Sequence, residues 1–296
     1  MKINLSVLIP ARNEARNISA CLSAIADWAD EILVVDSNST DDTQIIVERY
    51  GGTVIQFKYQ GGWPKKRQWA LDNYSFRNNW ILLLDADEIV RDELKREIEQ
   101  AMSASDKVGY YIALENIFLG RQLRWGGFRF YKLSLFQHGK GRYEKRIDRH
   151  TEDMADIEIH EHVTADGPTG TLRQAIEHRN INNLSRYIEK HNDYSNWEAE
   201  VMYQVYKGTL LDDELPPRLF GGNQAQQRRW LKNKFFFLPG FSVVAFVYHY
   251  FVRLGFLDGR AGLIYCGFQA VQRFHTKAKV LEMVLAERIT DSFPSE

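Results

Sequence analysis

Three acidic residues that follow a short apolar stretch are the strongest candidates for chemistry in this chain. Residues 80–84 have the length of one buried strand, and Asp85, Asp87 and Glu88 come directly after them. Ligands of open α/β sheets bind at the carboxyl ends of strands. Mg²⁺ and Mn²⁺ prefer carboxylate oxygens and share them with substrate phosphates. The stretch therefore predicts a metal–diphosphate site, and the alternative is a solvated acidic turn before the next helix.

Strand-like and helical patterns alternate through the first hundred residues. This alternation is typical of βαβ units and of a mostly parallel sheet, in which the strands end at one edge. Two further polar loops, 10–14 and 36–41, should lie beside the acids at 85–88 and line one pocket with them. The expected strands are 5–9, 31–35, 53–57 and 80–84, and the expected helices are 18–28, 41–50, 65–74 and 92–102.

The pattern changes after residue 102, where strand-like segments follow one another without long helices. Such segments predict antiparallel additions to the sheet. We therefore expect an α/β fold, a Rossmann-like mixed sheet with helices on both faces, in residues 1–182 and a helical region in residues 183–296. The later strand-like segments are 110–114, 122–125, 132–136 and 157–160, and the first helix of the second region is expected at 183–206.

The composition argues against several other classes of protein. The chain has 296 residues, 44% of them hydrophobic, and a net charge of -1, so we expect no nucleic-acid partner. Cys21 and Cys266 have no partner at metal-ligand spacing, so a disulfide framework is not expected. We also expect no signal peptide, because the N-terminus runs directly into a strand. The loop at 10–14 lacks a glycine-rich fingerprint, so a nucleotide would be held by carboxylates and a metal.

Three cationic residues, Lys65, Lys66 and Arg67, begin the third predicted helix. Positive charges are locally unfavourable at a helix N-terminus. Their presence predicts a negative partner nearby, either a phosphate or the acids at 85–88. The alternative is a basic turn that is simply solvated.

The last eighty residues are rich in basic and aromatic side chains. Residues 235–252 contain no Lys, Arg, Asp or Glu, and they are at the short limit for a membrane span. Basic flanks around aromatic helices suit an anionic membrane surface. We expect this segment to lie in the membrane plane or to re-enter it, and a helical core or a dimer interface is the alternative.

At this point the residues resemble a known family. The loops at 10–14 (PARNE), 36–41 (DSNSTD) and 85–87 (DAD) look like those of family 2 glycosyltransferases with the GT-A fold, over roughly residues 1–180. Three later segments are similar to the WaaE-like branch, the lipopolysaccharide-core β-glucosyltransferases. These segments are 63–68 (WPKKRQ), 159–162 (IHEH) and 255–259 (GFLDG).

The resemblance implies an inverting transfer of a hexose from a UDP-sugar, with UDP-glucose as the expected donor. The implied acceptor is a lipid-linked or lipopolysaccharide glycan at the cytoplasmic face of the inner membrane, where the enzyme would be peripheral or monotopic. Asp87 would bind Mn²⁺ or Mg²⁺, and His178 matches an additional metal or phosphate ligand unless it packs or caps a helix. The implied nucleotide-binding residues are Pro10, Ala11, Arg12, Glu14, Asp36, Ser37, Lys65, Arg67 and Asp85.

Inversion in one displacement needs a base that deprotonates the acceptor hydroxyl, which is typically worth about 10²–10⁴ in rate. We expect Glu161 to be this base, and a structural ion pair is the alternative. His160 and His162 would orient Glu161 or touch the acceptor. Trp125 would form an acceptor wall, or else it is part of the core. The other candidate bases are Asp153, Asp156 and Glu144.

Two other functions are consistent with paired acids on a βαβ sheet. A nucleotidyltransferase would usually carry a glycine-rich, basic loop after its first strand, whereas the loop at 10–14 has one arginine and no glycine. A membrane-bound scaffold or sugar-nucleotide sensor would keep the fold without turnover. Tight binding of a UDP-sugar without hydrolysis or transfer would distinguish such a sensor from an enzyme.

Overall fold

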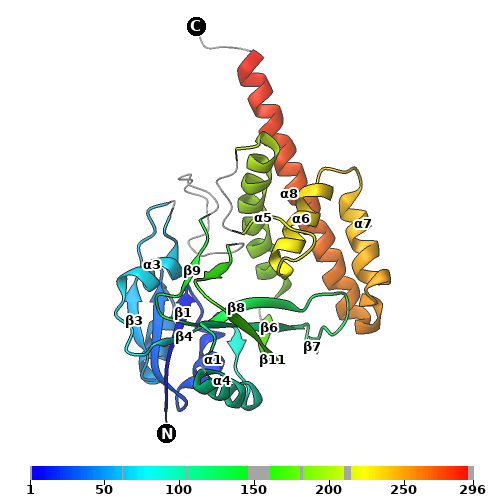
Figure 1. The fold of residues 1–296 in the computed structure, drawn as a ribbon. Helices are drawn as coiled ribbons and strands as arrows, with labels where there is room; N and C mark the ends of the chain where they lie inside the picture. Colours follow the sequence, from blue (N-terminus) through cyan, green and yellow to red (C-terminus); the bar gives the residue numbers. More distant parts are fainter. Residues whose placement is uncertain are drawn as a thin grey trace. The chain divides into compact units, whose positions relative to one another are not determined.

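A computed structural model describes residues 2–61, 63–104, 106–145, 161–180, 183–209 and 215–292 of the chain. The chain divides into two compact units, whose elements are labelled in Figure 1. The sheet unit comprises residues 1–123, 128–144 and 156–181. The helical unit comprises residues 124–127, 145–155 and 182–296.

The sheet unit is built on one mixed β-sheet. Its described strands are β1 (Ile3–Ala11), β2 (Ala29–Asp36), β3 (Thr53–Gln56), β4 (Trp80–Leu83), β5 (Glu88–Ile89), β6 (Gly109–Phe118), β7 (Arg121–Gln122), β8 (Phe130–Gln137) and β11 (Thr169–Asn180). They lie in the order β3-β2-β1-β4-β8-β6-β11-β5, with β7 beside β6. β1 to β4 pair in parallel, and β8 joins β4 in the antiparallel sense. The predicted mixed sheet with later antiparallel additions is thus confirmed.

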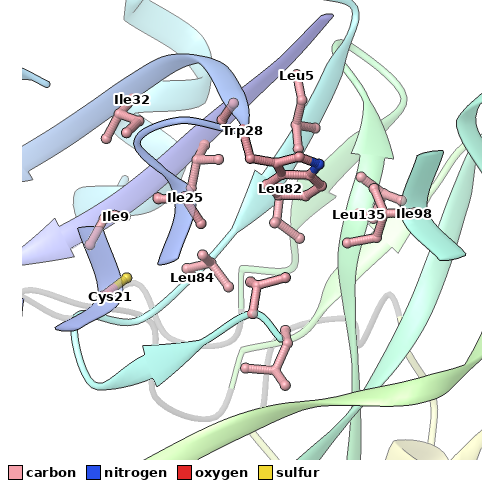
Figure 2. Close-up of a cluster of buried hydrophobic side chains, with 14 of the residues drawn as sticks. Leu5, Ile9, Cys21, Ile25, Trp28, Ile32, Leu82, Leu84, Ile98 and Leu135 are labelled. Atoms are coloured by element: carbon pink, nitrogen blue, oxygen red, sulfur yellow. The ribbon is translucent and has the colours of Figure 1, made fainter. Parts of the chain in front are cut away.

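Alternation along the central strand β1 explains why helices cover both faces of the sheet. Leu5, Val7 and Ile9 belong to one buried cluster, whereas Leu8 belongs to another. Figure 2 shows part of the first cluster, in which Cys21 lies near Ile9 and Trp28 lies near Leu5. The helices that contribute to this cluster are α1 (Ile18–Ile25), α2 (Thr43–Arg49) and α4 (Asp92–Ala104), and α3 (Lys66–Asn73) contributes to the second. Both cysteines are free and buried.

The helical unit has a small core of its own. Ala199 and Met202 of the long helix α5 pack there with Phe236 and Val280. The predicted helix at 183–206 is α5, although its ends differ by one residue. The elements of this unit are α5 (Leu184–Lys207), α6 (Gln224–Phe235), α7 (Phe241–Val247), the π-helical turn η1 (Tyr248–Val252), the 3-10 turn η2 (Gly255–Asp258) and α8 (Gly259–Ser292).

The apolar segment at 235–252 is divided among short elements and does not form one long helix. No single helix of the described residues has the length and mean hydropathy of a membrane span. Phe241–Val252 and Gly255–Ile289 meet both criteria only as a pair, and they are bent by 72° at the break between them. The break contains Leu254 in the left-handed region, at φ 61°, which interrupts the helix.

Two strand predictions need comment. The strand expected at 122–125 is wrong beyond Gln122, because the N–H groups of Arg124 and Trp125 donate to the carboxylate of Asp258 in the helical unit and not to a neighbouring strand. Trp125 is 43% exposed, so its alternative assignment to the core is also wrong. The strand expected at 157–160 lies outside the described residues.

Candidate functional site

The loops that follow β1 and β2 are hydrogen-bonded to each other, as the shared sheet edge predicts. The N–H of Asn13 donates to Ser39 Oγ at 2.7 Å, and the N–H of Thr40 donates to Asn13 Oδ1 at 2.8 Å. Asp36 is buried and accepts from the N–H of Ser39 at 2.8 Å and from the Ser39 hydroxyl. Each carboxylate oxygen has a second lone pair, so Asp36 can order its loop and still accept from a ligand.

The other predicted nucleotide-binding residues of these two loops differ in their burial and in their hydrogen bonding. Pro10 and Ala11 are buried, whereas Arg12 is exposed. Glu14 supports its loop, because its N–H donates to Thr43 Oγ1 at 2.9 Å and its carboxylate accepts from the Asn17 amide at 2.7 Å. The Ser37 hydroxyl is buried without a hydrogen-bond partner among the described residues. Because a buried hydroxyl normally finds a partner, Ser37 fits a site that is completed by a polar ligand.

The three cations at the start of α3 are all buried, so the prediction of a solvated basic turn is wrong. Lys66 Nζ donates to the carbonyl of Ala11 at 2.8 Å, which ties α3 to the end of β1. Lys65 Nζ lies 3.0 Å from Glu161 Oε1, and the Arg67 guanidinium is paired with Asp85. The predicted negative partners are therefore present within the protein itself.

The acids that follow β4 form a charge network. Lys132 Nζ lies 3.1 Å from Asp85 Oδ2 and 3.2 Å from Glu88 Oε1, and Glu88 accepts from the N–H of Asp85 at 2.9 Å. Burial alone would raise the pKa of Asp85, but Arg67 and Lys132 hold it well below its usual range. Burial and the neighbouring Asp85 raise the pKa of Glu88. Asp85 is thus the firmly ionised carboxylate of the network.

Removing the ion pair between Arg67 and Asp85 should lower the stability of the fold. We expect Arg67→Met to lower the free energy of unfolding by about 3 kcal/mol, because it leaves the Asp85 carboxylate with one cation in place of two. Urea denaturation measures the change. Arg96→Met is the matched control, since Arg96 forms an exposed pair with Glu93 at 3.6 Å and should cost less than about 0.5 kcal/mol. Equal losses in both variants would contradict a structural role for the buried pair.

Asp87 and His178 are brought together by a two-residue strand of the sheet, β5. β5 pairs with β11 in antiparallel register, which sets Glu88 opposite His178. His178 Nε2 lies 3.2 Å from Asp87 Oδ2, and His178 Nδ1 lies 2.9 Å from Asn116 Oδ1. Burial lowers the pKa of His178, but the charges of Asp87 and Glu88 outweigh burial and raise it. The Asp87 side chain is 10% exposed, so the prediction of a solvated acidic turn is wrong.

The pair of Asp87 and His178 fits a divalent cation. Two ligand atoms at neighbouring positions of an octahedral Mg²⁺ lie roughly 3 Å apart, close to the 3.2 Å between these side chains. The bond from Nδ1 to Asn116 leaves Nε2 facing Asp87, as in histidines whose second nitrogen is oriented by a neighbour. No group of three potential His, Cys, Asp or Glu ligands occurs within the described part of the chain. Two protein ligands match the way Mg²⁺ is usually shared with water and substrate phosphates.

The predicted base Glu161, the other candidate bases and the predicted acceptor residues lie in different parts of the structure or outside the described residues. Glu161 is buried in its ion pair with Lys65. The N–H of His162 donates to Glu144 Oε1 at 2.9 Å, and Glu144 is fully buried. Trp125 belongs to the helical unit. His160, Asp153 and Asp156 lie outside the described residues.

Two residues of the site were not predicted, Lys132 on β8 and Asn116 on β6. Both lie on strands that join the sheet after a change of direction. Their only sequence signal is a polar residue within a mostly apolar strand, and this signal does not reveal which strand lies next to β4. Lys132 nevertheless contacts Asp85, and Asn116 contacts His178, both of which were predicted site residues.

Comparisons with known proteins agree on one family. The model of glycosyl transferase family 2 matches residues 6–179. The chain is 29% identical to the lipopolysaccharide core biosynthesis glycosyltransferase LpsC of Rhizobium meliloti, over 95% of this chain and 93% of the relative. It is 26% identical to an uncharacterized glycosyltransferase of Rickettsia felis, over 96% and 92%. The structure of S. aureus TarS with UDP-GlcNAc is similar in fold, with a TM-score of 0.50 and 15% identity, over 96% of this chain and 92% of TarS.

Proposed function

Because the chain belongs to glycosyl transferase family 2 and has the GT-A fold, we propose that it moves a hexose from a UDP-sugar to a lipopolysaccharide-core or lipid-linked glycan with inversion. The observation that carries this proposal is the site at the end of β4. There Asp85 is held ionised by two cations, and Asp87 lies 3.2 Å from His178. Such a constellation fits a diphosphate with its cation.

The donor is proposed to be a UDP-sugar, with UDP-glucose as the first candidate. TarS binds UDP-GlcNAc on a similar fold, which supports the nucleotide rather than the sugar. In this chain the uridine would lie against Pro10, Ala11 and Asp36. The unpartnered hydroxyl of Ser37 would gain a hydrogen bond there. Arg12, which is exposed, would be free to close on the nucleotide.

Asp87 and His178 are the residues that would hold Mn²⁺ or Mg²⁺. When bound, the cation would offset negative charge that develops on the leaving diphosphate. Asn116 would keep His178 in the orientation that ligation requires, because it binds the other ring nitrogen. Glu161 is the proposed base for the acceptor hydroxyl, with Lys65 as its partner until substrate arrives.

The proposed acceptor is a glycan carried on a lipid, and the proposed location is the cytoplasmic face of the inner membrane. The similarity to LpsC, a lipopolysaccharide core biosynthesis glycosyltransferase, supports a lipopolysaccharide-core acceptor. The helical unit exposes many large apolar side chains, for example Val243, Phe251 and Phe274. Exposed apolar surface of this extent is typical of an interaction site. A peripheral or monotopic enzyme would use this surface to remain near a lipid-held acceptor.

Donor hydrolysis tests the proposal directly. Purified protein is incubated with UDP-, GDP- and dTDP-sugars in Mn²⁺, in Mg²⁺ or in EDTA, and released nucleoside diphosphate is measured. We expect slow hydrolysis of one UDP-hexose that requires a divalent cation, with at least about a hundredfold loss in EDTA. Equal rates in EDTA would overturn the assignment of Asp87 and His178, and absence of binding by any nucleotide sugar would overturn the donor class.

A further inference from the structure

Three arginines and a histidine of the helical unit converge on one glycine pair. Arg228 Nη2 donates to the carbonyl of Gly127 at 3.2 Å, and His249 Nδ1 lies 2.7 Å from the carbonyl of Gly126. Arg273 Nη2 in turn lies 3.4 Å from His249 Nε2. Arg228, Arg253 and Arg273, together with His249, are called the arginine cluster below.

Arg253 completes the cluster by lying against Gly127 itself. A Cβ atom added to Gly127 would stand 3.0 Å from Arg253 Nε and 3.2 Å from its Cζ. Gly127 also has a φ of +74°, a conformation that glycine adopts without strain. The backbone of Arg253 is fixed as well, because its carbonyl accepts from the N–H of Gly126 at 2.8 Å. Gly127 therefore leaves room for the close approach of the guanidinium, which would have to shift by a few tenths of an ångström if a Cβ atom were present.

The positive charges of the arginine cluster repel one another. Burial, followed by the positive charges of Arg253 and Arg273, lowers the pKa of Arg228 to about 10. Glu198 offsets part of this effect at Arg273, since its charge raises the pKa of Arg273 against the larger effect of burial. Asp258 accepts from the N–H groups of Arg124 and Trp125. Glu198 is paired with Lys232 and accepts from Thr276. An anion beside the cluster would relieve the mutual repulsion.

The surroundings of the cluster are apolar, which distinguishes it from a site for a free ion. His249 and Arg253 lie within a segment in which several large apolar side chains are between 38% and 64% exposed. These side chains are Val247, Phe251, Val252, Leu254, Phe256 and Leu257. A dissolved phosphate ion would gain no binding energy from these exposed apolar side chains. The phosphate of a lipid carries its own apolar part, which these side chains would contact.

We propose that the arginine cluster binds the phosphate group of an anionic lipid, while the exposed side chains of residues 247–257 enter the boundary between headgroups and acyl chains. Arginine suits this task because its planar fork matches phosphate oxygens. The inference rests on the proposed association of the helical unit with a membrane surface. It adds the chemical group that is recognised and the residues that recognise it.

Vesicle binding of the full chain tests the inference. Sedimentation with vesicles of phosphatidylcholine, with and without phosphatidylglycerol, gives the partition constants. We expect wild type to prefer the anionic vesicles, Arg253→Gln to weaken that binding about fivefold and Arg253→Gln with Arg273→Gln about thirtyfold, since each arginine near an anionic surface is worth about 1 kcal/mol. Arg253 is exposed, so its replacement should leave the fold intact, and thermal unfolding of each variant checks this.

A matched variant separates a specific site from general attraction. Arg218→Gln removes the same charge from an exposed position of the same unit and should change binding less than about twofold. An equal loss in Arg218→Gln and Arg253→Gln would overturn the site. Full displacement by millimolar inorganic phosphate at constant ionic strength would overturn lipid as the source of the phosphate. Wild type that hydrolyses donor but binds no anionic vesicle would overturn this inference and leave the transferase assignment standing.

Discussion

Replacing Asp87 by asparagine is expected to lower glycosyl transfer about a thousandfold, which corresponds to about 4 kcal/mol of transition-state stabilisation. The amide keeps the shape of the side chain but loses the charge that a divalent cation needs beside His178 Nε2. Initial rates at saturating donor and Mn²⁺ measure the effect. Asp92→Asn is the control, because Asp92 is an exposed acid that pairs with Lys95 at 3.0 Å, and it should retain full activity.

The same substitution has a second readout that does not require turnover. The Asp87 carboxylate is the largest contribution that raises the pKa of His178 against the effect of burial. A folded Asp87→Asn protein should therefore show a lower pKa for His178 when its ring is titrated by NMR without metal. A rate like that of wild type, or an unchanged pKa of His178, would contradict the close pairing and the ligand role built on it.

Glu161→Gln is expected to lower transfer to the acceptor by about 10²–10⁴-fold while the KM for the donor stays nearly constant. A general base acts on the acceptor hydroxyl, so its loss should slow chemistry and leave nucleotide binding alone. Transfer to a lipopolysaccharide-core acceptor at saturating donor measures kcat. Donor KM from the same series shows whether the pocket has been disturbed.

The buried ion pair of Glu161 offers a competing explanation, and Lys65→Gln separates the two. Both substitutions break the 3.0 Å contact between Lys65 Nζ and Glu161 Oε1, but only Lys65→Gln keeps a carboxylate at position 161. We expect Glu161→Gln to be the slower enzyme by at least about tenfold. If Glu161 served the fold alone, the two variants would lose activity and melting temperature in parallel.

The parallel half of the sheet and its acidic edge were predictable because the relevant information is local. Buried parallel strands are short apolar runs, and the acids at 85–88 follow one of them directly. The loops at 10–14 and 36–41 then had to reach the same edge, and the bond from Asn13 to Ser39 shows that they do. In the parallel half of the sheet the local sequence pattern agrees with the topology, so the pattern predicts the topology.

The antiparallel half could not be placed in the same way. Lys132 reaches Asp85 because β8 inserts between β4 and β6, and Asn116 reaches His178 because β11 lies parallel to β6. The residue types of these strands do not indicate the order of the strands in the sheet. The strand predicted at 122–125 was wrong at Arg124 and Trp125 for a related reason. Their hydrogen-bond acceptor, Asp258, lies more than a hundred positions away in the chain.

The two-residue strand β5 gives the site an order of assembly during translation. His178 lies 91 positions after Asp87, and it must leave the ribosome before the two side chains can meet across β5 and β11. A nascent chain thus contains Asp36, Arg67 and Asp85, together with its parallel strands, well before His178 is synthesised. A chain released early would still present the nucleotide edge but would lack the ligand from β11, so truncated products should bind nucleotide without gaining thermal protection from Mn²⁺.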